Sequence, residues 1–282
     1  TIGIVGESGC GKSTLANAIL GMVKPTGGRV LFKGQDVHAL SGRGLRELRR
    51  DMQMIFQDPQ SSLNERAKVS YIVGEGLQNV RPDLTAAQRE EKVRQALLDV
   101  GLLPEFASRF PHEFSGGQRQ RIGIARALIV EPEFIIADEP ISALDMSIRA
   151  QVLNLLLDLR EQFGLTYLFI SHDLNVVSYV SDRIGVMYLG NLVEYGATED
   201  IFKNPLHPYT KALFSAIPVP DPTAKMNRIV LEGSIPSPAN PPAGCKFHTR
   251  CAQCMEQCKT EVPEQREIEP GHFVVCHLYD QK

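Results

Sequence analysis

A glycine-rich run near the start of the chain has the spacing of a phosphate-binding loop. Residues 6–14 read Gly-Glu-Ser-Gly-Cys-Gly-Lys-Ser-Thr and match G-x-x-x-x-G-K-[ST]. Glycines let successive backbone N–H groups point at phosphate oxygens, and the N-terminus of the next helix adds partial positive charge. Lys12 can reach the β- and γ-phosphates, and the Ser13 hydroxyl can ligate Mg²⁺. The expected nucleotide contacts are Gly6, Ser8, Gly9, Cys10, Gly11, Lys12, Ser13 and Thr14.

Two adjacent carboxylates follow a second apolar segment. Residues 134–137 read Phe-Ile-Ile-Ala, and Asp138 and Glu139 come directly after them. This pattern resembles a Walker B strand, in which Asp138 would hold Mg²⁺ and Glu139 would polarise the attacking water. The alternative, a strand that simply ends in acidic surface residues, is disfavoured because a phosphate loop lies upstream.

The elements that must position these groups alternate between strands and helices. Thr85 and Gln88 form a capping-box pattern, which predicts a helix over 85–101. Continuous apolar runs predict buried parallel strands. The expected strands are 2–5, 29–33, 52–56, 134–138 and 166–170, with a hairpin of 184–189 and 192–195 turning at Gly190-Asn191, and the other expected helices are 12–22, 117–130 and 149–163. This alternation predicts an α/β fold with a largely parallel core.

Further motifs follow in a fixed order along the chain. Gln57 closes the strand 52–56, residues 114–118 read Phe-Ser-Gly-Gly-Gln, residues 142–145 read Ser-Ala-Leu-Asp, and His172 closes the strand 166–170. With the phosphate loop and the acidic pair, this ordered set resembles the nucleotide-binding subunit of ABC transporters. The resemblance covers residues 1 to about 200. It implies a P-loop NTPase core of the RecA type, with an ABC helical subdomain over about residues 60–130.

The resemblance also gives each motif a role. Gln57 would contact Mg²⁺ and the water, and His172 would contact the γ-phosphate. Residues 115–118 look like the signature motif, which binds ATP held by a partner subunit. The resemblance thus implies the catalytic residues Glu139, His172 and Gln57, the magnesium ligands Ser13, Gln57 and Asp138, and further nucleotide contacts from Ser115, Gly116, Gly117, Gln118 and Asp145.

The chain departs from the family pattern in two places. The signature begins with Phe114 where many members have leucine, an apolar exchange that we expect to be tolerated. The chain also opens inside a buried strand at Ile2, so we expect an N-terminally truncated fragment. The missing part would include the strand that carries the adenine-stacking aromatic residue.

The last third of the chain has a different composition from the body. Half of the 18 prolines lie between Pro205 and Pro242, which predicts an extension running over a surface without regular helix or strand. Residues 204–210 and 244–251 resemble the C-terminal extension of oligopeptide and dipeptide importer ATPases, a group that includes nickel importers. The predicted domains are therefore a nucleotide-binding domain over 1–203 and a peptide-importer extension over 204–282.

Five of the six cysteines lie in this extension. The resemblance implies a cytosolic chain, in which thiols stay reduced, so the cluster indicates metal binding before disulfides. Four thiolates suit a [4Fe–4S] cluster, which some importer ATPases carry, or Zn²⁺ in its place. A chain without metal is the third alternative, and Cys254 is left over. The candidate ligands are Cys245, Cys251, Cys258 and Cys276.

Composition limits the remaining alternatives. With 30 Lys and Arg against 33 Asp and Glu, the net charge of -3 gives no general attraction to nucleic acid. No apolar run approaches the roughly 18 residues of a membrane span. The leading hypothesis is an ATPase that energises a bacterial importer for di- or oligopeptides, the alternatives being nickel or another small solute and a metal- or redox-regulated soluble ATPase.

The resemblance further implies the assembly and its place in the cell. A second ATPase subunit, identical or related, would face the first, with two ATP molecules between them. Two membrane permeases and, indirectly, a periplasmic solute-binding protein would complete the importer. The chain would lie on the cytoplasmic face of the inner membrane as a peripheral subunit.

Overall fold

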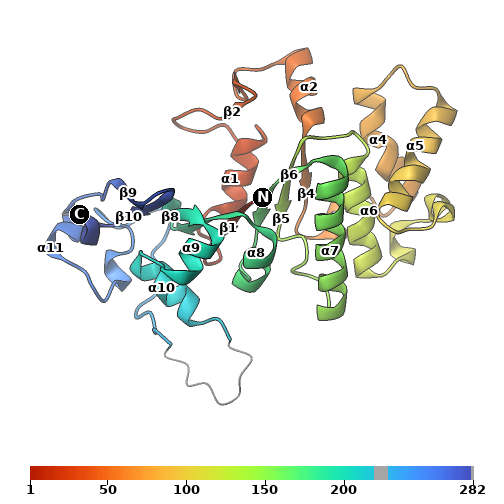
Figure 1. The fold of residues 1–282 in the computed structure, drawn as a ribbon. Coiled ribbons are helices and arrows are strands. Elements are labelled where there is room, and N and C mark those ends of the chain that lie inside the picture. Colours follow the sequence, from red (N-terminus) through yellow and green to blue (C-terminus); the bar gives the residue numbers. More distant parts are fainter. Residues whose placement is uncertain (219–227, 281–282) are drawn as a thin grey trace. The chain divides into compact units, whose positions relative to one another are not determined.

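The computed structural model describes residues 1–218 and 228–280, so part of the proline-rich stretch lies outside the described residues. Figure 1 labels the helices and strands, and contacts along the chain divide it into two compact units. Unit 1 combines Thr1–Lys12 with Phe169–Lys282, and unit 2 is Ser13–Leu168. The predicted division into 1–203 and 204–282 stays a prediction.

Unit 2 has a small parallel sheet and a group of helices. Strand β4 (Met52–Ile55) pairs in parallel with β5 (Phe134–Asp138). Strand β6 (Thr166–Ile170) starts where Thr166 N–H donates to the carbonyl of Glu133, at the beginning of β5. A separate two-stranded sheet joins β2 (Leu31–Phe32) to β3 (Gln35–Asp36). The carboxyl ends of β4 and β5 therefore share one edge, where Gln57 and Asp138 stand.

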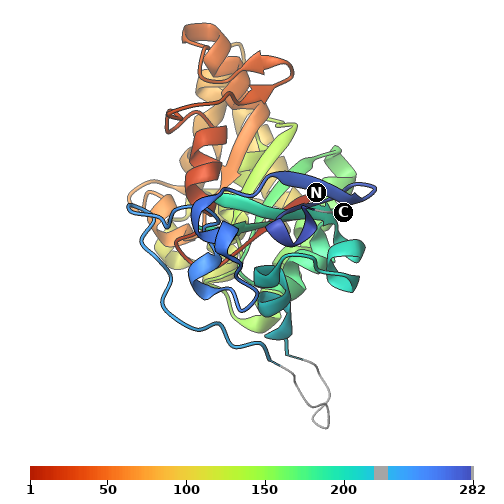
Figure 2. The same cartoon turned by 90° about the vertical axis from the view of Figure 1, so that its left-hand side faces the viewer.

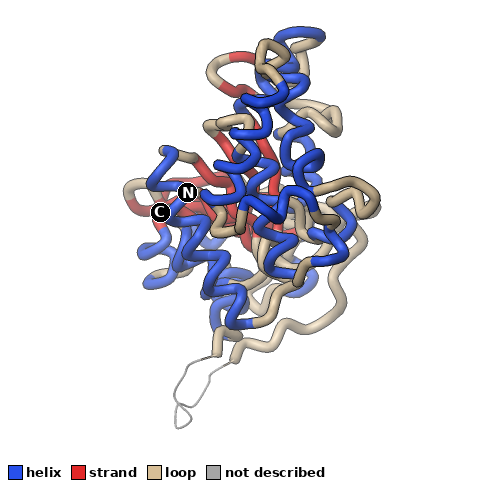
Figure 3. The backbone as a smooth tube through the Cα atoms, turned by 90° about the vertical axis from the view of Figure 1, so that its right-hand side faces the viewer, coloured by secondary structure: helices blue, strands red, loops and turns tan. Residues whose placement is uncertain are grey.

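Three of the helices of unit 2 form a packed group. Helices α4, α5 and α6 pack against one another, and this group faces the viewer in Figure 3. Helix α1 begins at Lys12, which is the last residue of the first segment of unit 1, and its other residues belong to unit 2. The helices are α1 (Lys12–Ile19), α2 (Gly42–Asp51), α3 (Pro59–Ser62), α4 (Val69–Val80), α5 (Ala86–Asp99), α6 (Gly116–Leu128) and α7 (Met146–Phe163), with short 3₁₀ helices η1 (Pro104–Ser108) and η2 (Pro111–Glu113).

Unit 1 is built on a mixed sheet. Strand β1 (Ile2–Val5) pairs in parallel with β7 (Arg183–Tyr188), and β7 forms an antiparallel hairpin with β8 (Asn191–Ala197). Two strands of the extension continue this sheet, since β10 (His272–Val275) pairs with β8 and β9 (Gln265–Glu269) pairs with β10 (Figure 2). The other elements are α8 (Leu174–Val180), α9 (Thr198–Lys203), α10 (Pro208–Ser215), α11 (Glu256–Thr260), η3 (His248–Arg250) and η4 (His277–Tyr279).

Local signals placed several elements correctly. Strands β5 and β6 have the expected bounds, and Thr85 and Gln88 form the expected capping box at the start of α5. Gly164 ends α7 in the left-handed conformation, with φ 65°, as a glycine C-cap does. Asp145 occupies the N-cap of α7, so this helix begins at Met146, three residues before the expected start.

Two expectations for unit 1 were wrong. The hairpin turn is Leu189-Gly190, with φ 45° and 80°, not Gly190-Asn191. Positive φ at both central residues is the type I′ geometry that suits the twist of a hairpin. The proline-rich stretch was expected to lack helices, yet it contains α10. Pro208 stands at the first helical position, where proline is favoured because no backbone donor is needed there.

No helix in the described part of the chain is both long and apolar enough to span a bilayer. The buried residues instead form the cores of the two units, as in β5, where Ile135 and Ile136 are fully buried.

Candidate functional site

The phosphate loop is shaped by glycines in unit 1. Gly9 and Gly11 have φ 78° and 102°, in the region that favours glycine. A Cβ on Gly6 would lie 2.2 Å from the carbonyl oxygen of Met187, at the end of β7. The tip of the β7–β8 hairpin supports the loop from the same side, because Gly190 N–H donates to the carbonyl of Cys10 at 2.8 Å. The loop is thus a close-packed backbone turn, as its sequence predicted.

Lys12 is folded into this loop. Its side chain is buried, and Nζ donates to the carbonyls of Gly6 at 2.8 Å and Glu7 at 3.2 Å. A cation is therefore held inside the curl of backbone, which fits an anionic ligand such as a phosphate chain. Burial raises the pKa of the neighbouring Cys10 thiol, against the opposing effect of Lys12. The neutral thiol fills space and is no activated nucleophile.

Glu7 makes contacts that the sequence did not reveal. Its backbone N–H donates to Tyr209 Oη at 3.0 Å. Its carboxylate accepts from both terminal nitrogens of Arg250, at 2.8 and 3.3 Å. Glu7 occupies a variable position of the loop pattern, and the sequence marks Arg250 only as part of the extension. No local signal links two residues 243 positions apart.

His172 follows β6 in unit 1. The preceding Ser171 donates its N–H to the carbonyl of Ile4 in β1, at 3.1 Å. The next residue, Asp173, caps α8 by accepting from the N–H groups of Asn175 and Val176. The backbone around His172 is thereby fixed on both sides, at the end of a core strand, where the sequence placed it.

In unit 2 the structure brings two predicted catalytic residues into contact. Gln57 Nε2 donates to Glu139 Oε2 at 3.0 Å. Glu139 has φ 46°, a conformation that is uncommon for a residue with a side chain. Ser142 stabilises this turn, because its N–H and its hydroxyl both donate to the carbonyl of Glu139. Strain held at a site by its surroundings is a known mark of functional residues.

The oxygen donors of unit 2 suit Mg²⁺. Asp138 is buried at the end of β5, Ser13 lies in the first turn of α1, and Gln57 follows β4. Carboxylate, hydroxyl and amide oxygens are hard ligands of the kind that Mg²⁺ prefers. The donor set therefore fits the ion that a nucleotide site requires.

The signature residues begin α6. Ser115 is the N-cap, and it forms a reciprocal capping box with Gln118. Gly117 lies against α7, where a Cβ would meet Ile148 Cγ2 at 2.5 Å. Gly116 has more room, because its Cβ would lie 3.7 Å from Leu144. Only a glycine at 117 allows this approach of the two helices, which brings the start of α6 near the start of α7 and its N-cap Asp145.

The four candidate metal ligands influence one another. Burial, together with the charges of Cys245, Cys251 and Cys258, raises the pKa of Cys276 to about 12. Cys245 N–H also donates to the carbonyl of Cys258. Yet within residues 1–218 and 228–280, no group of three or more His, Cys, Asp or Glu side chains is arranged to hold a metal ion. The side chains as placed do not fit an iron–sulfur cluster or zinc, and the structure gives that prediction no support.

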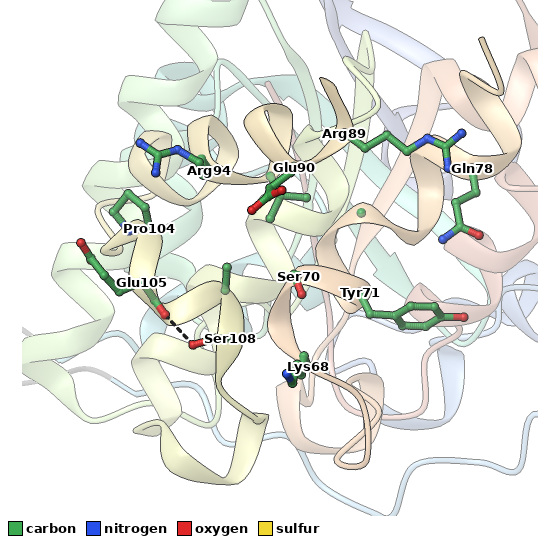
Figure 4. Close-up of a pocket in the computed structure, with 13 residues that line it drawn as sticks. Lys68, Ser70, Tyr71, Gln78, Arg89, Glu90, Arg94, Pro104, Glu105 and Ser108 are labelled. Carbon is green, nitrogen blue, oxygen red and sulfur yellow. Dashed lines mark hydrogen bonds between the residues drawn. The ribbon is translucent and has the colours of Figure 1, made fainter. Parts of the chain in front are cut away.

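A pocket of about 490 Å³ lies away from the predicted residues, among the helices of unit 2 (Figure 4). Its lining comes from α4, α5 and η1, and it includes Tyr71, Arg89 and Glu105. Ser108 donates to the carbonyl of Glu105 at its edge. It contains none of the predicted site residues, so its volume does not identify a nucleotide site.

Comparison with known proteins identifies the family. Residues 1–142 match the ABC transporter family, and residues 193–258 match the family described as oligopeptide/dipeptide transporter, C-terminal region. The chain is 57% identical to the oligopeptide transport ATP-binding protein AppF of Bacillus subtilis, over 99% of this chain and 85% of that protein. It is 53% identical to the oligopeptide transport ATP-binding protein OppF of Haemophilus influenzae, over 98% and 84%.

Solved structures show the same fold. The cbiO1 protein of Clostridium perfringens, part of an ABC transporter complex, aligns with a TM-score of 0.64 at 31% identity, over 72% of this chain and 79% of that one. The ATP-binding cassette MJ0796 bound to ADP and Pi aligns with a TM-score of 0.63 at 32% identity, over 70% and 84%. These matches confirm the predicted α/β, P-loop NTPase fold. By its phosphate loop, its fold and its near full-length relatives, the chain belongs to the ABC transporter family and carries the C-terminal region of the oligopeptide/dipeptide transporters.

Proposed function

We propose that the chain is the ATP-hydrolysing subunit of a bacterial importer for di- or oligopeptides. The observation that carries the proposal is the phosphate loop, with Lys12 buried among its carbonyls. The names of the relatives confirm the prediction of an ATPase subunit that serves peptide import. None of the names quoted above favours nickel or a soluble regulatory ATPase. Family membership also implies the use of ATP and Mg²⁺.

Each predicted residue has a proposed task in this reaction. Lys12 and the amides of residues 6–14 would bind phosphate oxygens, and Ser13 and Asp138 would ligate Mg²⁺. Glu139 would accept a proton from the attacking water. Gln57 would orient Glu139 through the hydrogen bond between them. His172 would contact the transferred phosphoryl group. Residues 115–118 and Asp145 would contact the nucleotide that a second subunit holds.

The assembly is part of the proposal. The match to ABC transporters and the solved dimer of MJ0796, a bacterial ABC transporter cassette, support a pair of ATPase subunits. Two permease subunits would couple this pair to transport, and a periplasmic protein would deliver the solute. The chain would bind the permeases at the cytoplasmic face of the inner membrane.

Substitution of the proposed general base tests the mechanism. In the assembled transporter, Glu139→Gln should lower ATP turnover by about 10²–10⁴-fold, because the amide cannot accept a proton. Binding of ATP should persist. Glu133→Gln is the matched control, since Glu133 precedes the same strand and its exposed carboxylate pairs with Lys33. Unchanged turnover in Glu139→Gln would refute the assigned role.

The cysteines are tested separately. The predicted [4Fe–4S] cluster, or zinc in its place, rests on the number and spacing of the four cysteines alone, since their arrangement in the described residues forms no metal-binding group. Anaerobically purified protein with a cluster should be coloured and contain iron. A colourless sample without iron excludes the cluster, and metal analysis then distinguishes zinc from no metal.

A further inference from the structure

Two residues of the extension form hydrogen bonds with Glu7 of the phosphate loop. Tyr209 Oη accepts the backbone N–H of Glu7 at 3.0 Å, and Arg250 donates two hydrogen bonds to its carboxylate. The same residue is tied into the loop, because its carbonyl accepts from Lys12 Nζ and from Cys10 N–H. Glu7 therefore joins the extension to the lysine and the amides that would bind phosphate.

Both extension residues are held rigidly. Tyr209 is fully buried, and the Arg250 side chain is only 7% exposed. The rings of Tyr188, Tyr209 and Phe247 contact one another, with centroids 4.8, 5.1 and 5.4 Å apart. Tyr188 lies at the end of β7 and Phe247 just before η3, so the ring cluster fixes the extension against the sheet of unit 1.

The cysteine segment in turn orders the backbone of Arg250. Cys245 N–H donates to the carbonyl of Cys258, and Arg250 N–H donates to that of Phe247. Cys251 N–H donates to the carbonyl of His248, which continues this run of tight turns. The guanidinium that contacts Glu7 thus projects from the turns that the cysteines enclose.

Charge makes this contact important for an anion-binding loop. A carboxylate in such a loop opposes phosphate binding unless its charge is compensated. The negative charge of Glu7 acts on other groups of the loop, because it contributes to the raised pKa of the Cys10 thiol. A buried, bidentate guanidinium is the strongest side-chain partner for a carboxylate. Arg250 therefore neutralises Glu7 and fixes its direction.

We propose that Arg250 and Tyr209 are positioning residues of the nucleotide site, which hold Glu7 so that the phosphate loop is ordered and free of uncompensated negative charge. This inference rests on the proposed function, since it assumes that the loop binds ATP. It makes the extension a determinant of ATP affinity.

Equilibrium binding of Mg·ATP to the full chain tests the proposal. Arg250→Gln should weaken binding by about tenfold, the lower end of what hydrogen bonds to a charged group contribute. Tyr209→Phe should weaken it by about fivefold, since it keeps the ring and removes only the acceptor of the Glu7 N–H. In a Glu7→Gln background, Arg250→Gln should change the dissociation constant by less than about twofold, because no carboxylate is left uncompensated.

A matched control separates this effect from general damage to the extension. Arg266 also pairs with a carboxylate of the extension, Asp280, and among the described residues neither of the two is hydrogen-bonded to the phosphate loop. Arg266→Gln should therefore leave ATP affinity unchanged. Hydrogen exchange without nucleotide gives an independent readout, because the amides of residues 6–12 should exchange faster in Arg250→Gln and not in Arg266→Gln.

The outcomes separate this proposal from the proposed function. A wild-type chain that binds no ATP overturns both. A wild-type chain that binds ATP while Arg250→Gln binds it equally well overturns this inference alone. If Arg250→Gln does not fold, Arg250→Lys and Tyr209→Phe decide the matter, and wild-type affinity in both of them rejects the proposal.

Discussion

Glu139 and Gln57 show how single residues are prepared for chemistry. Glu139 is held in a left-handed backbone conformation, and Gln57 donates directly to its carboxylate. The two residues come from the ends of neighbouring parallel strands, β5 and β4. Because the contact restricts the direction of the carboxylate, Gln57 would influence the proposed general base in addition to its proposed contact with Mg²⁺.

Removal of this contact should affect catalysis more than binding. We expect Gln57→Ala to lower kcat of the assembled ATPase by about tenfold or more with a smaller change in KM, since a misdirected base costs transition-state stabilisation. Gln53→Ala on β4 is the control, because the Gln53 amide donates to the carbonyl of Arg49 instead. Steady-state kinetics check both variants. Equal kcat in Gln57→Ala and wild type would contradict the role.

The buried His207 should make the stability of the fold depend on pH. Burial lowers the pKa of His207 to about 4, with Glu194 opposing and Lys211 adding to the shift. Its Nδ1 accepts the N–H of Tyr209, which requires the unprotonated nitrogen. The folded state therefore binds fewer protons than the unfolded state between pH 4 and about 6.5, and stability falls as pH falls through this window.

We expect the His207 contribution to decrease by about 2 kcal/mol between pH 7 and pH 5. Urea unfolding of wild type and His207→Asn at both values measures it. Asparagine can keep a side-chain acceptor for the helix N-terminus but does not titrate. A loss of stability of the same size in both proteins would mean that other groups carry the pH dependence.

At the scale of elements, α6 contains two buried glycines that are used differently. A Cβ at Gly117 would lie 2.5 Å from Ile148 Cγ2, whereas nothing lies within 4 Å of a Cβ at Gly123. The first glycine permits a close approach of α6 and α7. The second only lowers the helix propensity of the segment.

The alanine substitutions at Gly117 and Gly123 should therefore change the free energy of unfolding in opposite directions. We expect Gly117→Ala to cost about 1–3 kcal/mol through overpacking. We expect Gly123→Ala to stabilise by up to about 1 kcal/mol. Denaturant unfolding measures both, and Ile148→Ala should partly rescue Gly117→Ala. Destabilisation of equal size at the two positions would show that the contact with Ile148 is not the cause.

Some elements were predictable from the sequence and others were not, for physical reasons. The capping box of Thr85 and Gln88 and the phosphate loop are local patterns, so sequence alone placed them. The predicted hairpin turn was wrong by one residue, because Leu189 adopts a positive φ that is uncommon for leucine. The contact of Arg250 with Glu7 arises only when the chain has folded. Tertiary contacts of this kind leave no periodic or spaced signal.

At the scale of the whole molecule, the extension is an integral part of unit 1. Its anchor is Glu194 on β8, which is 1% exposed. The two carboxylate oxygens accept from the backbone N–H groups of Leu206 and His207, at 2.8 and 2.9 Å, and from His272 Nε2 at 2.8 Å. One carboxylate thus joins the start of the extension to its strand β10.

Loss of this anchor should release the extension. We expect Glu194→Ala to cost about 3 kcal/mol or more, because three buried donors lose their partner. Limited proteolysis should then cut near residues 204–208 faster than in wild type. Glu199→Ala, an exposed position on α9, is the control and should change stability by less than about 1 kcal/mol. Resistance of Glu194→Ala to both urea and protease would rule out the anchoring role.

The pairing of β10 with β8 also bears on solubility. Without the two strands of the extension, β8 would present a row of unsatisfied backbone donors and acceptors, the kind of edge on which chains aggregate. In the complete unit the outermost strand is β9, which reads Gln-Arg-Glu-Ile-Glu, and its charged side chains discourage a further strand from adding there. A chain ending at residue 203 should therefore self-associate during purification, as light scattering would detect, while the full chain remains dispersed.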